Sequence, residues 1–263
     1  MASKKSAKNT LKEAVTLSYK LQRFVSYADF FNRVPLFISL QVSNQSSETI
    51  DDIDVVIENA SGLLLPFSKH LEHLPFESTV EIATEDVLSP LYLTEISEIT
   101  VQPVTIKALS GATVIVEERA EVTVLPFDYW SGRSGNAELL SCFSRPKIAD
   151  CLRVLSEAQE QLKKWGIACE WRGYAEGDKN KIRQIAAAIF SVLKKNSIEK
   201  SAAEFQYEDP MPVGDITKIL KTRVGTSFEL TLFIVSCLEC ANLHPVIAVS
   251  YTHLRAHETD SYL

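Results

Sequence analysis

The sequence predicts an α+β protein, with an antiparallel β-sandwich in its first half and a smaller domain of helices and sheet in its second half. Two observations lead to this fold class. Short β-branched segments separated by turn-forming residues recur up to about residue 128, and apolar residues then repeat at helical spacing. In addition, an unusually apolar helix is expected to start near residue 226.

Six segments of the first half have the length and the apolar alternation of strands. They cover residues 13–20, 36–44, 50–59, 78–84, 96–109 and 112–125. Turn-forming clusters at 44–47, 59–62 and 110–111 separate several of them. Short helical insertions are expected within 22–32 and at 89–92. Several strands joined by short turns favour a sandwich of antiparallel sheets.

Helical spacing dominates the second half. Asn136 is a candidate cap for a short helix over 137–143 that stops before Pro146. Two amphipathic helices follow, with apolar faces formed by Ile148, Cys151, Leu152, Leu155, Ala158 and Leu162, and by Ile182, Ile185, Ala186, Ile189, Phe190 and Leu193. A shorter helix is expected from Asp215, and "VIAV" at 246–249 is predicted to be a buried strand.

These patterns divide the chain into five parts. We expect a disordered N-terminus over 1–12, the β-sandwich over 13–126, and a linker with a short helix over 127–146. The second domain would cover 147–249, and it would be incomplete. Residues 250–263 differ in composition from the rest of the chain and are expected to form a non-native tail.

The composition is that of a soluble globular protein, with 46% apolar and 23% charged residues. No apolar run approaches the length that crosses a bilayer, and the N-terminus has no apolar signal core. We therefore expect a cytoplasmic location and no membrane partner. The five cysteines are an odd number, which indicates reduced thiols. Cys237 and Cys240 are expected to be two buried thiols rather than a metal or redox pair.

Charge is distributed unevenly along the chain. Residues 1–128 hold 10 Lys and Arg against 18 Asp and Glu, so this half is acidic. Because nucleic-acid affinity comes mostly from neutralising phosphates, direct nucleic-acid contact by 1–128 is not expected. For residues 129–249 the question stays open, since no basic stripe stands out. Asp51, Asp52 and Asp54 are interpreted as a solvated strand edge.

The histidines give no clear metal or catalytic signal. His253 and His257 have a spacing of four, but the glutamate context of a zinc helix is missing. His244 precedes a proline and is interpreted as a loop residue. His70 and His73 are expected to be solvated. No metal and no cofactor is therefore predicted for this chain.

One stretch carries a candidate site. Thr226 and Glu229 have the spacing of a capping box, which places Ser227 in the first turn of the apolar helix. A buried helix whose N-terminus opens to a cleft is how many thiol enzymes present their nucleophile, because the helix dipole lowers the thiol pKa. A serine gains little from this position and needs an adjacent base. Ser227 can therefore be a reactive residue or simply part of the cap.

Four segments carry a resemblance to a known family. They are "DYWSG…ELLSCFSRP", "RGYAEGDKNKIRQIAAAIFSVLKKNSIEK", "AEFQYEDP" and "RVGTSFELTLFIVSCLECANLHPVIAV". They resemble the N-terminal region of very large bacterial proteins, in which a domain of unknown function precedes superfamily-I-type helicase and nuclease-like regions. The last segment is similar to transglutaminase-like, papain-type folds, in which a Cys at the helix N-terminus works with a His on the next strand. The resemblance therefore implies that the second domain is a truncated transglutaminase-like domain.

Two departures from that family bear on activity. Ser227 stands where the family has Cys, and the segment that supplies the family's His is replaced by "SYTHLRAHETDSYL". That tail resembles translated sequencing-adapter DNA joined to an environmental gene fragment. The native sequence would then end near Val249, and the apolar edge of the 246–249 strand would lie open.

Three functions are compatible with these residues. The first is an interaction or regulatory module with a degenerate cysteine-peptidase-like site, whose partner is another protein or the downstream helicase domains of the parent chain. The second is an acyl-transfer enzyme of the transglutaminase or peptidase type, completed by a His further along the parent chain. The third is an accessory nucleic-acid contact by the second half. Whether the chain is an enzyme stays open, and catalysis by this stretch alone is not expected.

Overall fold

The computed structural model describes residues 14–168, 171, 174, 178–201 and 208–248. The chain divides into two units. The first contains Met1–Cys142 and Phe205–Val213, and the second contains Phe143–Glu204 and Gly214–Leu263. The segment predicted to be a linker, 127–146, is thus shared between the two units. The chain also returns to the first unit after residue 204.

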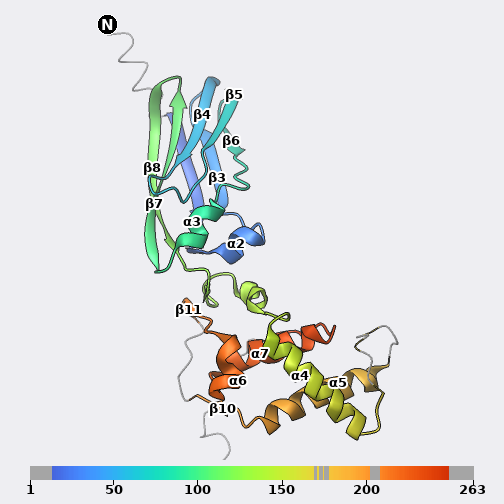
Figure 1. The fold of residues 1–263 in the computed structure, drawn as a ribbon. Helices are drawn as coiled ribbons and strands as arrows, with labels where there is room; N and C mark the ends of the chain where they lie inside the picture. The colour runs from blue at the N-terminus through green and yellow to red at the C-terminus, as the bar shows by residue number, and fades with distance from the viewer. Residues whose placement is uncertain (1–13, 169–170, 172–173, 175–177, 202–207, 249–263) are drawn as a thin grey trace, which may run out of the picture. The chain divides into compact units, whose positions relative to one another are not determined.

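Two larger sheets make up most of the first unit (Figure 1). The three-stranded sheet has the order β1-β3-β6 and is antiparallel; its strands are β1 (Val15–Leu21), β3 (Phe37–Asn44) and β6 (Ser78–Glu81). The five-stranded sheet has the order β2-β8-β7-β4-β5. Its strands are β2 (Phe24–Val25), β4 (Ile50–Glu58), β5 (Phe67–Leu74), β7 (Thr100–Ser110) and β8 (Thr113–Val124). Among these pairings only the short one of β2 with β8 is parallel.

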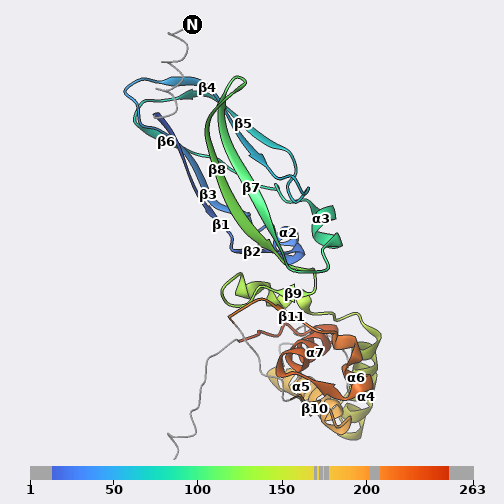
Figure 2. The same ribbon diagram turned by 90° about the vertical axis from the view of Figure 1, so that its left-hand side faces the viewer.

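Alternating side chains of both sheets meet in one hydrophobic core. Leu40 and Val42 enter it from the three-stranded sheet, and Val55, Ile57 and Ile106 enter it from the five-stranded sheet. Burying one such side chain contributes about 1.5–3 kcal/mol. The two sheets therefore form two layers around a common core, and Figure 2 shows the long β7–β8 hairpin of one layer. The predicted mixed α+β class is confirmed at this level.

The strand β5 was not predicted from the sequence, and its pairing with β4 is irregular. Ile50 and Ile53 are both buried although they are three residues apart, because Asp52 has a φ of 55° and the strand loses its period of two there. Its partner β5 keeps the same interval between Leu71 and Leu74. Asp51, Asp52 and Asp54 were predicted to form a solvated strand edge. They are accessible to solvent, but β4 is an inner strand that lies between β5 and β7.

Two short helices interrupt the strands, as predicted. They are α2 (Tyr27–Phe31) and α3 (Pro90–Glu95), and they contact each other. Ser89 caps α3 by accepting a hydrogen bond from Tyr92 N at 3.4 Å. Pro90 occupies the first helical position, where a backbone N–H would have no partner within the helix, so its missing N–H costs nothing. Ser26 and Asp29 form a capping box at α2.

The last part of the first unit joins residues that are distant in sequence. The strands β9 (Tyr129–Trp130) and β11 (Met211–Pro212) pair antiparallel, and the side chain of Trp130 is buried. Gly132 has a φ of 75°, and a Cβ there would lie 2.6 Å from Glu208 O. Glycine is therefore required for the close approach of the two backbones.

The second unit is mainly helical in its described part. Its main helices are α4 (Ala149–Lys164), α5 (Lys179–Lys195) and α7 (Ser227–Cys240), which contact one another. The shorter elements are η1 (Ala137–Phe143), at the junction of the two units, and η2 (Ile216–Lys218) and α6 (Ile219–Thr222). Its described strands, β10 (Glu199–Lys200) and β12 (Val224–Gly225), are two residues long and parallel. Asp178 and Asp215 cap α5 and η2 with their side chains, and a helix was expected from Asp215.

The prediction of a buried strand at 246–249 is wrong for the described residues. Residues 246–248 form no strand, and Val246 is 91% exposed. Val249 lies outside the described residues. A strand needs a neighbour for its backbone N–H and C=O groups, and no described strand pairs with this segment. In the part of the chain that the structure covers, no helix has the length and apolar character to span a membrane.

Candidate functional site

The N-terminus of α7 is closed by a reciprocal pair of hydrogen bonds. Thr226 Oγ1 accepts from Glu229 N at 3.2 Å, and Glu229 Oε2 accepts from Thr226 N at 2.8 Å. Glu229 Oε2 also accepts from Thr226 Oγ1 at 3.0 Å. These contacts use two backbone donors that a helix otherwise leaves free for a ligand. The carboxylate also supplies the negative charge that the helix dipole favours at this end.

A second segment packs against that carboxylate. Gly214 has a φ of 78°, and a Cβ built on it would lie 1.9 Å from Glu229 Oε1. The next residue, Asp215, accepts from Thr217 N at 3.0 Å and so begins η2. The turn before η2 therefore lies directly beside the carboxylate that closes α7, and it fits there only because residue 214 has no side chain.

Ser227 is half-buried in the first turn of α7. Its carbonyl oxygen accepts from Thr231 Oγ1 at 2.7 Å. Within the described residues its hydroxyl has no hydrogen-bond partner, so no described group acts as a base toward it. A serine needs such a base to become a nucleophile.

His244 is the single histidine that the structure describes in the second unit, and it lies beyond the other end of α7. The 14 residues of this helix, at a rise of 1.5 Å each, separate it from Ser227 by about 20 Å. The ring of His244 stacks on Tyr174 with centroids 5.5 Å apart, and the backbone N–H of His244 donates to Tyr174 Oη at 3.2 Å. It is therefore a loop residue held by an aromatic contact. His253 and His257 lie outside the described residues.

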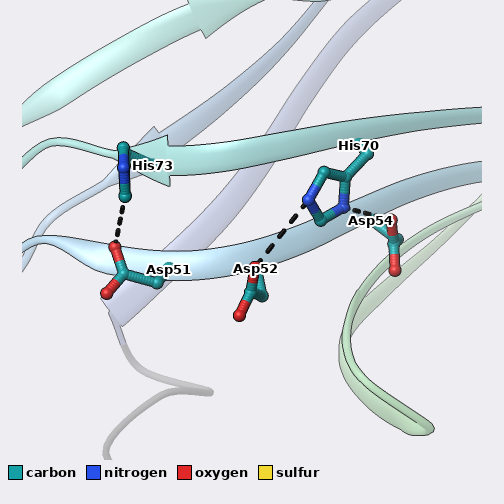
Figure 3. A network of polar contacts seen from close by, with 5 residues as sticks. All are labelled: Asp51, Asp52, Asp54, His70 and His73. Atoms are coloured by element: carbon teal, nitrogen blue, oxygen red, sulfur yellow. Dashed lines mark hydrogen bonds and ion pairs between the residues drawn. The ribbon is translucent and has the colours of Figure 1, made fainter.

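A cluster of histidines and aspartates lies on the exposed face of β4 and β5 (Figure 3). His73 Nδ1 and Asp51 Oδ1 are 2.7 Å apart, and His70 Nδ1 and Asp54 Oδ1 are 2.8 Å apart. His70 Nε2 also lies 3.8 Å from Asp52 Oδ1. The hydrogen bond to Asp51 and the charge of that carboxylate raise the pKa of His73. The sequence predicted solvated histidines but not these cross-strand pairs, because β5 was missed.

The His–Asp cluster does not form a metal site. Over the described stretches, no three His, Cys, Asp or Glu side chains are placed to hold a metal ion. The second ring nitrogen of His70 has one carboxylate near it, and His73 forms a separate pair. The arrangement thus provides two exposed contacts between neighbouring strands.

The first unit contains one buried carboxylate that the sequence analysis did not identify. Asp29 Oδ2 accepts from Ser26 N at 2.9 Å and from Ser26 Oγ at 2.7 Å, and Asp29 Oδ1 accepts from Asn136 Nδ2 at 2.5 Å. Burial raises the pKa of Asp29, although these three donors oppose the rise. Asn136 was predicted to cap a helix, but its side-chain amide is directed to this carboxylate.

The cysteines of the second unit are also closer than their positions suggest. Cys237 is buried as predicted, whereas Cys240 is only half-buried. Cys237 Sγ lies 3.7 Å from Cys151 Sγ on α4, and both side chains are fully buried. The hydrogen bond to Cys151 and burial raise the pKa of Cys237, so its thiol keeps its proton at neutral pH.

Each unit also has an open cavity. One of about 310 Å³ lies beside α2 and is lined by Phe30, Arg33, Leu36, Thr84 and Asp86, among others. The second, of about 370 Å³, is lined mainly by apolar side chains of α5 and α7, including Phe190, Leu193, Leu230 and Phe233. Ser227 lines neither of them.

Comparisons with known proteins give little guidance. No protein-family model and no curated protein matches the chain. A structure of Escherichia coli alpha-2-macroglobulin from domain MG7 to the C-terminus is 15% identical, with a TM-score of 0.29, over 89% of this chain and 40% of that one. The native conformation of the same protein is 13% identical, with a TM-score of 0.31, over 90% of this chain and 16% of that one.

A complex of Amycolatopsis orientalis exo-chitosanase is 12% identical, with a TM-score of 0.30, over 89% of this chain and 32% of that one. The chain thus spans less than half the length of each of these three proteins. Likeness at this level supports no conclusion about activity, substrate or partner.

Proposed function

We propose that this chain is the N-terminal part of a large bacterial helicase-associated protein and acts there as a non-catalytic interaction and regulatory module. The bacterial helicase context comes from the sequence resemblance. The non-catalytic part rests on one observation, which is the position of the Glu229 carboxylate. It accepts hydrogen bonds from Thr226 N and Thr226 Oγ1 at the helix end where a transglutaminase-like enzyme holds its nucleophile.

The second unit is, in this proposal, a transglutaminase-like domain that has lost its activity. Support comes from an apolar helix, α7, that packs against α4 and α5 and begins at the residue corresponding to the family's Cys. A thiolate at that position would lie within one helical turn of the Glu229 carboxylate. The two negative charges would repel each other, which opposes the effect of the helix dipole on the thiol pKa.

The experiment restores the thiol and measures its ionisation. In the variant Ser227→Cys, the alkylation rate of the new thiol with iodoacetamide is followed by mass spectrometry between pH 5 and 9. We expect it to fall about tenfold per unit below pH 8, as for an ordinary thiol. The exposed Cys142 in the same chain serves as the internal comparison.

A rate that stays constant down to pH 6 would contradict the proposal and favour the acyl-transfer enzyme. The variant Ser227→Cys/Glu229→Gln separates the two contributions at this helix end. If the carboxylate suppresses the thiolate, removing its charge will increase the alkylation rate at pH 7 severalfold.

The interaction surface that we propose is formed by α2 and α3 of the first unit. Phe31 on α2 is 70% exposed and Leu91 on α3 is 67% exposed, and the two helices contact each other. Large apolar side chains exposed on neighbouring elements are typical of protein-binding surfaces. The partner would be the downstream helicase-type region that the sequence resemblance implies, and no cofactor is required.

This part of the proposal is tested by binding. The downstream region of the parent gene, expressed separately, is titrated into the chain in a calorimeter. The double variant Phe31→Ser/Leu91→Ser should weaken binding at least tenfold. Phe76→Ser, which changes an exposed Phe on the turn between β5 and β6, should leave it unchanged. Equal effects of both variants would exclude α2 and α3 as the specific surface.

A further inference from the structure

Two thiols from distant parts of the sequence touch in the interior of the second unit. Cys151 lies in the first turn of α4 and Cys237 lies in the second half of α7, 86 positions later. Cys237 Sγ donates a weak hydrogen bond to Cys151 Sγ at 3.7 Å, and Cys151 Sγ donates to Arg145 O at 3.8 Å. Both side chains have no exposed surface.

A third thiol connects this pair to the surface. Cys240 follows Cys237 by three residues on α7, and residues at this spacing are neighbours on a helix. Unlike the other two it is half-buried, and its charge would be felt by both Cys151 and Cys237. Cys240 is therefore the accessible thiol of the three, and Cys237 and Cys151 lie buried in the contact between α4 and α7.

We propose that Cys151, Cys237 and Cys240 form an oxidisable site, in which a small hydroperoxide converts the Cys151–Cys237 contact into a disulfide bond that joins α4 to α7. With hydrogen peroxide, two S–H bonds and the O–O bond break, and one S–S bond and two water molecules form. The two sulfurs give up two electrons in total, and the peroxide oxygens accept them. Both thiol protons leave in the water.

The oxidant enters through Cys240. Its thiolate attacks the peroxide, which gives a sulfenic acid and hydroxide. The S–O bond of Cys240 then breaks as the Cys237 sulfur attacks, the Cys237 thiol proton joins the departing hydroxide to give water, and a Cys237–Cys240 disulfide forms. Cys151 attacks Cys237 and releases Cys240 as a thiol, so the final bond lies between α4 and α7. Burial raises the pKa of Cys240, so the reaction should be slow at neutral pH and faster at pH 9.

The experiment uses the full chain with Cys142→Ser and Cys169→Ser, which leaves the three thiols of the site. One equivalent of hydrogen peroxide at pH 8.5 should lower the mass by about 2 Da, as expected for one disulfide. One of the three thiols should remain, and digestion should yield a peptide that joins α4 to α7. No mass loss, or stepwise oxidation to sulfinic acid at all three cysteines, would overturn the proposal.

Two variants test the order of the thiols. Cys240→Ser should slow formation of the disulfide at least tenfold without changing its linkage, and an unchanged rate would remove Cys240 from the site. Cys151→Ala should stop oxidation at a Cys237–Cys240 disulfide. Substitutions in the core can disturb folding. The disulfide found in the digest of the chain that keeps all three site cysteines therefore tests the proposal independently of these variants.

Discussion

Thr226 and Glu229 each accept a hydrogen bond from the backbone N–H of the other, at 3.2 and 2.8 Å, and so close the first turn of α7. An enzyme of the thiol type needs this end of a helix to stay open to its substrate. Here the protein's own carboxylate occupies it. Ser227 therefore lies in a helix turn whose cap is already complete, and this cap should contribute to the stability of α7.

Replacing Thr226 by Ala should destabilise α7 by about 1 kcal/mol, because the Glu229 N–H loses its acceptor. Hydrogen exchange of α7 peptides, read by mass spectrometry, localises the effect to this helix. The matched control is Thr231→Ala at an exposed position of the same helix, where Oγ1 donates to Ser227 O. Equal exchange rates in the two variants would show that the cap does not stabilise the helix.

Replacing Gly214 by Ala should cost more than conformational strain alone. Strain at a positive φ is about 1–2 kcal/mol, and the new Cβ would also collide with the Glu229 side chain, at 1.9 Å from Oε1. Gly166→Ala is the matched control, since Gly166 has a φ of 72° with nothing within 4 Å of its Cβ position. Urea unfolding should rank Gly214→Ala as the less stable variant. Adding Glu229→Ala to Gly214→Ala should recover part of the lost stability, because it removes the side chain that the new Cβ meets. If no stability is recovered, the collision with Glu229 is not the cause of the loss.

The buried contact between Asp29 and Asn136 should be strongly coupled. Asp29→Ala leaves Ser26 N–H and the Asn136 amide without their acceptor, so we expect a loss of about 2–3 kcal/mol from the first unit. Asn136→Ala should cost about 1 kcal/mol, since it removes one neutral donor. A double-mutant cycle measured by urea unfolding should give less than the sum of the two losses. Strict additivity would show that the two side chains do not stabilise each other.

The His73–Asp51 pair should make the β4–β5 contact depend on pH. The pKa of His73 in the folded chain lies above its ordinary value of 6.5, because Asp51 accepts its hydrogen bond and carries a negative charge. Its stabilising contribution is therefore complete below about pH 6.5 and is lost as the pH rises through the folded pKa. Both side chains are exposed, so the effect is small.

NMR titration of the histidine ring protons measures this pKa directly. In the variant Asp51→Asn the pKa of His73 should fall toward 6.5, the value for an unpaired imidazole. Asp150→Asn, on the second unit, is the control and should leave the titration of His73 unchanged. If Asp51→Asn leaves it unchanged as well, the pair does not persist in solution.

Local features of the fold were predictable from sequence. Thr226 and Glu229 form the capping box that their spacing indicated, and a helix begins at Asp215 as predicted, because capping depends on residues within one turn. The helical period also predicted most of the buried faces of α4 and α5, but Leu152 and Phe190 are 57% and 61% exposed, and the buried Val154 and Val192 were not included in the prediction. The strand β5 was missed, since its exposed Ser, Lys, Glu and His residues hide the alternation that identifies a strand.

Contacts across the chain could not be predicted. Cys151 and Cys237 are 86 residues apart, and Asp29 and Asn136 are 107 apart, so neither spacing carries a signal. The strand predicted at 246–249 failed for a related reason. Its residues are apolar, as in a buried strand, but a strand also needs a neighbouring strand for its backbone hydrogen bonds. The periodicity of a sequence does not show whether such a neighbour exists.

The pairing of β9 with β11 has a practical consequence for dissecting the protein. Tyr129–Trp130 find their partner in Met211–Pro212, and the backbone at Gly132 lies against Glu208 and Asp209. A truncation after residue 142 would therefore delete part of the first unit, and a fragment that starts at 143 would carry an orphan β11. The first half should fold stably only when residues 208–213 are supplied to it, through a linker or as an added peptide. The second half should be more soluble when these residues are left out of it.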